Sequence, residues 1–205
     1  MRTMSPRGRP RTFDRDAALD EAMYVFWERG YEGTSLSDLT AAMKIGSPSL
    51  YAAFGGKEAL FREAIERYGE RFGQRPPEGE TARDAVEAWL RESARGYVEA
   101  GHPRGCMVVL AALNCTEQNR PVREFLAAKR RNNLIGVAAR LRRAVAEGDL
   151  PEDADVEGIV RFYGTILHGM SIQARDGAEL ADLEAVIDTA MTVWPRFLGK
   201  KTAPG

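Results

Sequence analysis

The chain has 205 residues, of which 44% are hydrophobic and 29% charged, so it can bury a sizeable core and is not globally disordered. Its net charge of −1 does not by itself suggest nucleic-acid binding. No apolar run reaches about 18 residues, which excludes a membrane-spanning helix, and with no apolar signal segment the sequence predicts a cytoplasmic protein. Alanine, leucine, arginine and glutamate outnumber the β-branched residues, which favours helix over sheet. The helix signals along the chain then predict an all-α fold of about nine helices.

The first 12 residues form a basic arm that is rich in proline, glycine and arginine. A terminus of this composition is predicted to be mobile. Arg7, Arg9 and Arg11 are candidates to enter a DNA minor groove. The alternative is an ordinary disordered terminus without a role in binding.

Residues 13–73 carry the signals of four helices. Asp14 is a candidate N-cap for the first helix, and Gly30 is a candidate stop. Ser35 and Asp38 have the spacing of a capping box, which predicts the start of the second helix. A longer fourth helix is predicted from Lys57 toward Phe72.

The third helix is short and lies between two breaks, at residues 46–48 and 55–56. Ser47 can cap it, and the proline that follows fits the first helical turn. An isolated helix needs roughly 12–15 residues to be even marginally stable, so this one needs tertiary anchors. Leu50 and Phe54 are four residues apart and can supply them. The arrangement predicts a helix-turn-helix whose short third helix enters the major groove.

Three segments of this region, FWERGYEGTSLSDLTAAMKI, SPSLYAAF and GGKEALF, are similar to the TetR family of bacterial transcriptional repressors. The resemblance is specific over residues 13–65 and only architectural beyond residue 75. It implies a homodimer that binds a near-palindromic DNA operator and releases it when a small molecule binds. By match to the family's motif, the phosphate-contacting positions are Thr34, Ser35, Tyr51 and Lys57, and the base-facing positions are Ser47, Pro48 and Ser49.

The residue types of the third helix predict how it reads DNA. The Tyr51 hydroxyl and the ammonium groups of Lys44 and Lys57 can hold phosphates. The reading face has no Arg, Lys, Asn or Gln, the side chains that recognise bases most specifically. We therefore expect much of the specificity to come from DNA shape. The alternatives are that Ser35 only caps its helix, that Tyr51 belongs to the core and that Lys57 is merely solvated.

The second part of the chain begins after a linker at residues 74–79, and residues 80–198 are predicted to form a ligand-binding and dimerisation domain. Residues 106–115 are almost wholly apolar, and their helical neighbours favour a helix. Cys106 and Cys115 would then lie too far apart for a disulfide and are expected to be reduced thiols. Further helices are predicted at about 121–147, 155–175 and 182–194.

Two sets of apolar residues in this domain are candidates for sites, although each residue can equally be ordinary packing. The ligand-cavity candidates are Trp89, Tyr97, Met107, Phe125, Phe162, Tyr163, His168 and Met170. The dimer-interface candidates are Val160, Ile166, Leu167, Val186, Ile187, Met191 and Trp194, because the last two predicted helices are apolar on more than one face.

No catalytic residue, metal site or cofactor is predicted. Cys106 near His102 suggests a nucleophile and a base, but no third orienting group is evident. The first alternative to a ligand-released repressor is a DNA-binding regulator without a ligand. The second is an all-α enzyme or small-molecule carrier whose helix-turn-helix is incidental.

Overall fold

The computed structural model describes residues 13–73, 75 and 77–198, and within these ranges it contains helices and no strand. The predicted all-α fold is confirmed, with nine helices of eight residues or more in the described ranges. They are α1 (Arg15–Arg29), α2 (Leu36–Met43), α3 (Ser47–Phe54), α4 (Lys57–Phe72), α5 (Ala82–Val98), α7 (Arg120–Asn133), α8 (Ile135–Glu147), α9 (Val156–Arg175) and α10 (Leu180–Met191). Two four-residue helices, α6 (Met107–Leu110) and α11 (Pro195–Leu198), complete the series with the 3₁₀ turn Glu117–Asn119.

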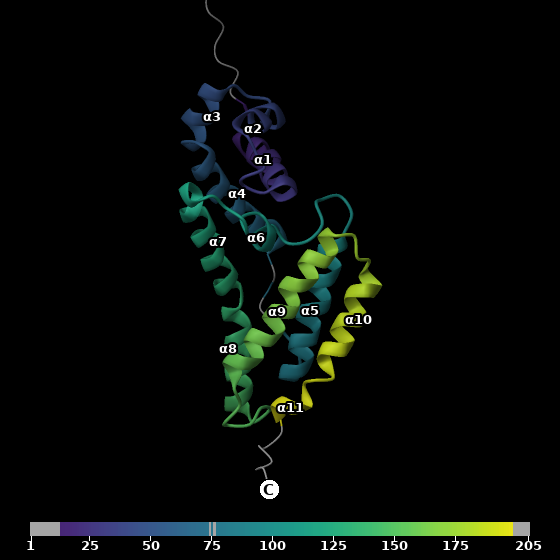
Figure 1. The fold of residues 1–205 in the computed structure, drawn as a ribbon. Coiled ribbons are helices and arrows are strands. Elements are labelled where there is room, and N and C mark those ends of the chain that lie inside the picture. The colour runs from purple at the N-terminus through teal and green to yellow at the C-terminus, as the bar shows by residue number, and fades with distance from the viewer. Residues whose placement is uncertain (1–12, 74, 76, 199–205) are drawn as a thin grey trace, which may run out of the picture.

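The helices form two bundles, one above the other (Figure 1). Helices α1 to α4 make the N-terminal bundle, and α5 and α7 to α10 make the C-terminal bundle, with α6 between them. Their buried side chains belong to one continuous hydrophobic cluster, so the two bundles share a core. None of the helices in the described ranges is long and apolar enough to cross a membrane.

Local capping signals explain the first two helices. The Asp14 carboxylate accepts hydrogen bonds from the backbone N–H groups of Asp16 and Ala17, at 3.0 and 3.1 Å. The predicted capping box is confirmed, because Ser35 Oγ accepts from the Asp38 N–H at 3.1 Å and the Asp38 carboxylate accepts from the Ser35 N–H at 2.8 Å. These bonds satisfy N–H groups that the helix itself leaves without partners.

The prediction that Ser47 caps α3 is wrong by one residue, because a Ser47 cap would make residue 48 the first helical residue and α3 begins at Ser47. Gly46 is the N-cap and makes no side-chain hydrogen bond, so Ser47 is the first helical residue. Leu50 is fully buried and Phe54 is 3% exposed. Burying side chains of this size contributes about 1.5–3 kcal/mol each. The helix is therefore held by its two predicted anchors rather than by its own length.

The predicted helix over 121–147 is wrong in one respect, because it breaks at Leu134 into α7 and α8. The Leu134 N–H donates to the Arg131 carbonyl at 3.1 Å, a tighter turn than an α-helix makes. A Cβ at Gly164 on α9 would lie 2.9 Å from a Leu134 methyl carbon. At the break, the Leu134 side chain packs against Gly164 of the neighbouring helix.

The segment from Cys106 to Cys115 is not one helix either. Only α6 is helical, and the chain then leaves the helix because the Ala111 carbonyl accepts a hydrogen bond from the Tyr31 N–H at 2.7 Å. Just before α6, the Gly105 carbonyl accepts from Trp27 Nε1 at 3.1 Å. Two backbone groups of this segment are therefore hydrogen-bonded to the end of α1 and the residues that follow it.

We predict that Gly105→Ala strongly destabilises the fold. Gly105 has a φ of +77°, and an added Cβ would lie 2.6 Å from the Ser171 carbonyl oxygen and 2.8 Å from a Leu110 methyl carbon. Backbone strain and overpacking together should cost roughly 2–4 kcal/mol of unfolding free energy. Gly101→Ala is the matched control, because Gly101 also has a positive φ, +98°, but open space around its Cβ position.

The measurement is urea unfolding of both variants at one protein concentration. Gly101→Ala should lose only about 1–2 kcal/mol from backbone strain. Equal losses for the two variants would show that the contact of Gly105 with α9 is not tight.

Candidate nucleic-acid interface and ligand cavity

The outer face of α3 is polar, small and exposed. Its exposed residues are Ser47, Pro48, Ser49, Tyr51 and Ala52. The Tyr51 side chain is 52% exposed, so it is not part of the core. The face has no long cationic side chain, which leaves it narrow enough for a groove but poor in donors that distinguish bases.

Lys44 lies at the turn between α2 and α3 and is exposed. It is the C-cap of α2 and has a φ of 54°, the left-handed conformation that helix ends favour. This conformation ends α2 and turns the chain toward α3. Its ammonium group has no ion pair among the described residues, so it is available to a phosphate.

Thr34 and Ser35 differ in what they offer a phosphate. Thr34 is 1% exposed and its hydroxyl donates to the Gly30 carbonyl at 2.6 Å, so its side chain offers little surface to a phosphate, and its place at a phosphate-contacting position remains a prediction. Ser35 is exposed. Its hydrogen bonds lower the pKa of the Asp38 carboxyl, as does the Arg29 guanidinium 2.7 Å from it. Phosphate binding by Ser35 remains a prediction.

Lys57 begins α4, and its ammonium nitrogen lies 4.2 Å from the centre of the Tyr31 ring. Partial burial lowers the pKa of this lysine, and the nearby Glu32 opposes that shift. The N-cap of α4, Gly56, has no side-chain cap bond. The first N–H groups of α4 are therefore open to an anion, while the lysine side chain must leave Tyr31 to reach one.

A cavity of about 520 Å³ lies where the two bundles meet. It is bounded by α1 and α4 of the N-terminal bundle and by α5, α7 and α9 of the C-terminal bundle, with the segment around α6. A hollow of about 720 Å³ on the outside of α5 is larger but shallow, and one helix forms all of it. The cavity at the junction has the size of typical small-molecule sites.

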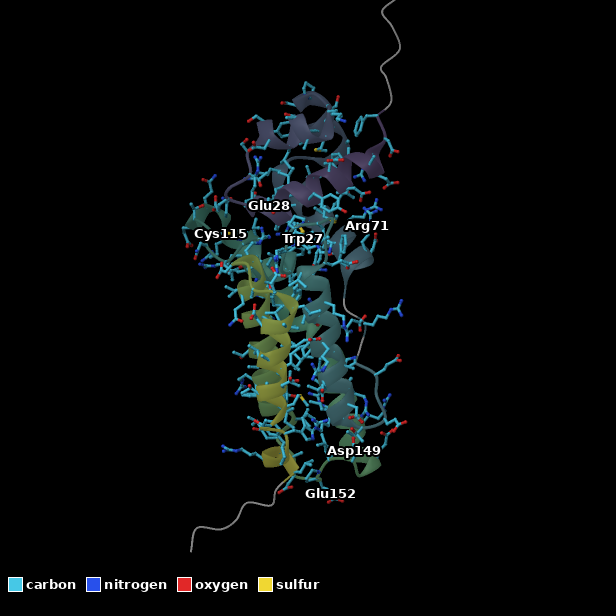
Figure 2. The ribbon with its side chains drawn as sticks, turned by 90° about the vertical axis from the view of Figure 1, so that its right-hand side faces the viewer. Trp27, Glu28, Arg71, Cys115, Asp149 and Glu152 are labelled. Atoms are coloured by element: carbon cyan, nitrogen blue, oxygen red, sulfur yellow. The ribbon has the colours of Figure 1, made fainter. Side chains whose placement is uncertain are left out.

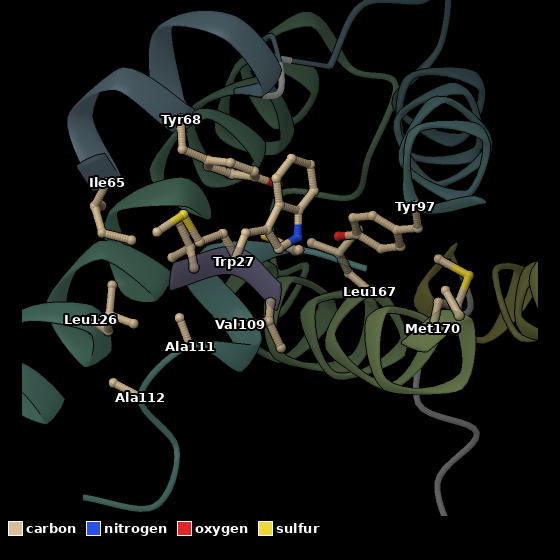
Figure 3. Close-up of a cluster of buried hydrophobic side chains, with 14 of the residues drawn as sticks. Trp27, Ile65, Tyr68, Tyr97, Val109, Ala111, Ala112, Leu126, Leu167 and Met170 are labelled. Carbon is tan, nitrogen blue, oxygen red and sulfur yellow. The ribbon is translucent and has the colours of Figure 1, made fainter. Parts of the chain in front are cut away.

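Trp27 closes this cavity on the side of the N-terminal bundle. Figure 2 places Trp27 at the level of the junction, and Figure 3 shows it between Tyr68 and Tyr97. Its ring stacks on His102 at 4.6 Å and meets Tyr68 edge-on at 4.8 Å. Because Trp27 is 2% exposed, it both fills the shared core and faces the cavity.

Two of the predicted cavity residues, Tyr97 and His168, line this cavity, and the others do not. Met107, Tyr163 and Met170 are buried in the core, and Trp89 faces a separate hollow of about 370 Å³. The remaining two, Phe125 and Phe162, are half-buried; Phe125 lies under the Arg62 guanidinium, and Phe162 packs against Tyr163. Lining residues that were not among the predicted cavity residues include Trp27, Tyr68, Phe72, His102, Val109 and Arg130.

The chemistry of the cavity does not support a nucleophilic cysteine. Cys106 lines it, but burial raises the pKa of its thiol despite the hydrogen bond with Tyr68. The thiol therefore stays protonated and weakly nucleophilic. Burial lowers the pKa of His168, and the Arg130 charge lowers it further, which favours the neutral imidazole.

Five of the seven predicted dimer-interface residues are buried within the subunit itself. Val160, Leu167, Ile187, Met191 and Trp194 are each less than 9% exposed. Their side chains pack among α5, α9 and α10, which corrects their assignment to an outer surface. Ile166 and Val186 are only half-buried. Ile172 on α9, which the sequence did not suggest, is 43% exposed.

Two protein-family models match the chain. The one described as "Bacterial regulatory proteins, tetR family" matches residues 18–64, and the one described as "Tetracyclin repressor-like, C-terminal domain" matches residues 81–193. The first model covers the helix-turn-helix and the first half of α4. The second covers the helices α5 to α10.

Relatives match over nearly their full length. The HTH-type transcriptional repressor ComR of Escherichia coli is 34% identical over 197 residues, covering 94% of each chain. The HTH-type transcriptional repressor BdcR of Escherichia coli is 29% identical over 184 residues, covering 86% of each. A solved structure of a cysteine mutant of the TetR family regulator CifR, complexed with 26-base-pair operator DNA, has 47% identity and a TM-score of 0.87, covering 92% of this chain and 100% of the other.

We predict that Lys44→Asn weakens DNA binding without weakening the fold. Asparagine tolerates the left-handed conformation that Lys44 adopts, so the turn should survive. Each lost phosphate contact should lower the slope of log affinity against log salt by about 0.9. The measurement is DNA affinity at several salt concentrations, with urea unfolding as the check on folding.

The control is Arg143→Gln, which removes an exposed cation from α8 in the other bundle. It should leave the salt slope unchanged. A Lys44→Asn slope equal to that of the parent protein would show that Lys44 contacts no phosphate.

Proposed function

The chain belongs to the TetR family of bacterial transcriptional regulators, and on that premise we propose that it is a repressor that leaves its DNA operator when a small molecule binds. Residues 13–73 then bind DNA, and residues 80–198 bind the effector and form the dimer. One observation carries the proposal most strongly. The same four-helix bundle that presents the exposed face of α3 also closes the junction cavity with Trp27.

The contacts at DNA follow from the geometry of α3 and its neighbours. Ser47, Pro48 and Ser49 face the bases, while Lys44, Ser35, Tyr51 and the first turn of α4 hold phosphates. Because this reading face has few specific donors, much of the specificity comes from DNA shape. Arg7, Arg9 and Arg11 lie outside the described residues, and their place in a minor groove remains a proposal.

Release depends on how the N-terminal bundle is held. A ligand in the cavity contacts Trp27 directly and lies beside the segment that Trp27 and Tyr31 bind through hydrogen bonds. Trp27 and this segment are expected to take one arrangement in the DNA-binding state and another in the released state. A ligand that binds one arrangement more tightly shifts the equilibrium toward that state. The N-terminal bundle then moves as a unit relative to the C-terminal bundle.

A dimer places two copies of α3 on the two halves of an operator. The exposed faces of α9 and α10 are available for this contact, and Ile172 with the half-buried Ile166 and Val186 gives them apolar character. The interface lies on these outward faces rather than on the buried residues of the same helices.

The test is an unbiased selection of operators from random DNA, followed by binding measurements on the full-length protein. The proposal predicts one enriched near-palindrome, bound by two chains, and a dimeric mass by light scattering at micromolar concentration. Failure to enrich any sequence would favour an all-α small-molecule-binding protein with an incidental helix-turn-helix.

A ligand screen on the selected operator distinguishes the remaining alternative. Release of the DNA by at least one small molecule supports the proposed repressor. Operator binding that no compound affects would favour a constitutive regulator with a cavity that has no regulatory role.

A further inference from the structure

Among the described residues that line the cavity, Arg130 is the one half-buried arginine; the three other arginines, Arg71, Arg75 and Arg95, are exposed. Arg130 projects from α7 and is half-buried. Its Nη1 donates to the Val108 carbonyl at 3.0 Å. A guanidinium has five N–H donors, so most of those of Arg130 have no partner within the described part of the protein.

No carboxylate in the described part of the chain balances the charge of Arg130. Arg130 forms no ion pair among the residues that the structure describes, unlike Arg71, which pairs with Asp20 at 2.9 Å. Burial lowers the pKa of Arg130, and the Arg131 charge beside it acts in the same direction. The two acids that line the cavity, Glu92 and Glu99, are exposed at its rim. A half-buried cation without a counter-charge is costly unless a ligand provides one.

His168 is a second polar group in the lining of the cavity. It lies on α9 and lines the same cavity, and no hydrogen bond joins it to any described residue. A neutral imidazole, which the lowered pKa of His168 favours, can donate one hydrogen bond and accept another. Two polar side chains from different helices thus line the cavity, Arg130 with one hydrogen bond to the described residues and His168 with none.

Much of the remaining lining of the cavity is aromatic. Trp27, Tyr68 and Tyr97 lie side by side there, and Val109 and Leu167 add aliphatic surface (Figure 3). A ligand that fits this lining and the Arg130 guanidinium has an apolar or aromatic body and one anionic group. A guanidinium binds a carboxylate through two parallel hydrogen bonds, which no other single side chain does as well.

We infer that the effector is a small organic carboxylate, whose anionic group pairs with Arg130 and whose apolar body lies against Trp27, Tyr68 and Tyr97. This inference rests on the proposed role of the cavity as the effector site. It adds the chemical class of the effector, and it makes Arg130 the residue that selects for charge.

The test uses three acids and their neutral amides: benzoate and benzamide, cinnamate and cinnamamide, and 2-naphthoate and 2-naphthamide. Each is titrated by calorimetry into the full-length protein and into the variants Arg130→Gln, Arg130→Lys and Arg131→Gln. Arg131 is the matched control because it is the next residue on α7 but is exposed and lines no part of the cavity. Thermal unfolding and far-UV circular dichroism establish that each variant is folded.

At least one acid should bind roughly tenfold or more tightly than its own amide, as expected for a charge-assisted pair in a partly buried site. Arg130→Gln should remove this difference by weakening the acid alone. Arg130→Lys should keep part of it, and Arg131→Gln should keep all of it. An amide that binds as tightly as its acid in every pair would overturn the inference.

Two further results would also overturn the inference: no saturable binding of any acid up to millimolar concentration, or an Arg131→Gln effect equal to that of Arg130→Gln. Operator binding is measured separately and without ligand. If the operator is bound but the acids fail, only the ligand class is wrong. If the acids bind through Arg130 but no operator is found, the regulatory function is wrong and the chemistry of the cavity stands.

Discussion

The hydrogen bond between Trp27 and Gly105 is the contact on which the rest of the structure depends. Trp27 belongs to the bundle that carries the recognition helix, and Gly105 belongs to the segment that lies over the cavity. The Gly105 N–H donates to the Tyr97 carbonyl, and the Cys106 N–H donates to Ser171 Oγ. The backbone of Gly105 and Cys106 is therefore hydrogen-bonded to α1, α5 and α9. A buried tryptophan contributes several kcal/mol of packing, so this connection is not easily broken.

A second contact, made largely by exposed residues, also joins the N-terminal bundle to the segment around α6. The Glu32 carboxylate accepts hydrogen bonds from the backbone N–H and the hydroxyl of Thr116 and from the Asn119 amide, at 2.7–2.9 Å. These bonds lower the pKa of Glu32, and the bond from Asn119 has the largest effect. Together the two contacts hold the end of α1 and the turn that follows it to the segment around α6. A ligand that displaces this segment must move the helix-turn-helix with it, which gives the cavity a physical route to DNA affinity without any change inside α3.

The helix-turn-helix was predictable because its signals are local. Asp14, Ser35 and Asp38 cap helices with their neighbours in sequence, and Leu50 and Phe54 are anchors at helical spacing. The features that the sequence missed depend on contacts between distant residues. The break at Leu134 follows from its packing against Gly164, the short α6 from the bond between Tyr31 and Ala111, and the cavity from Trp27 on the other bundle. Periodicity also cannot say which apolar face of α9 packs inward, so most of the predicted dimer residues proved to be core.

The central claim is that the operator and the cavity both act on Trp27. The most direct measurement is ¹⁹F NMR of the full-length protein labelled with 5-fluorotryptophan, with and without the selected operator. The chain has three tryptophans, so each resonance can be assigned by one substitution. The Trp27 resonance should shift when DNA binds, while Trp194, which packs on Tyr163 and Phe197 in the C-terminal bundle, should not. A Trp27 resonance that the operator leaves unchanged would contradict the coupling between the recognition helix and the cavity.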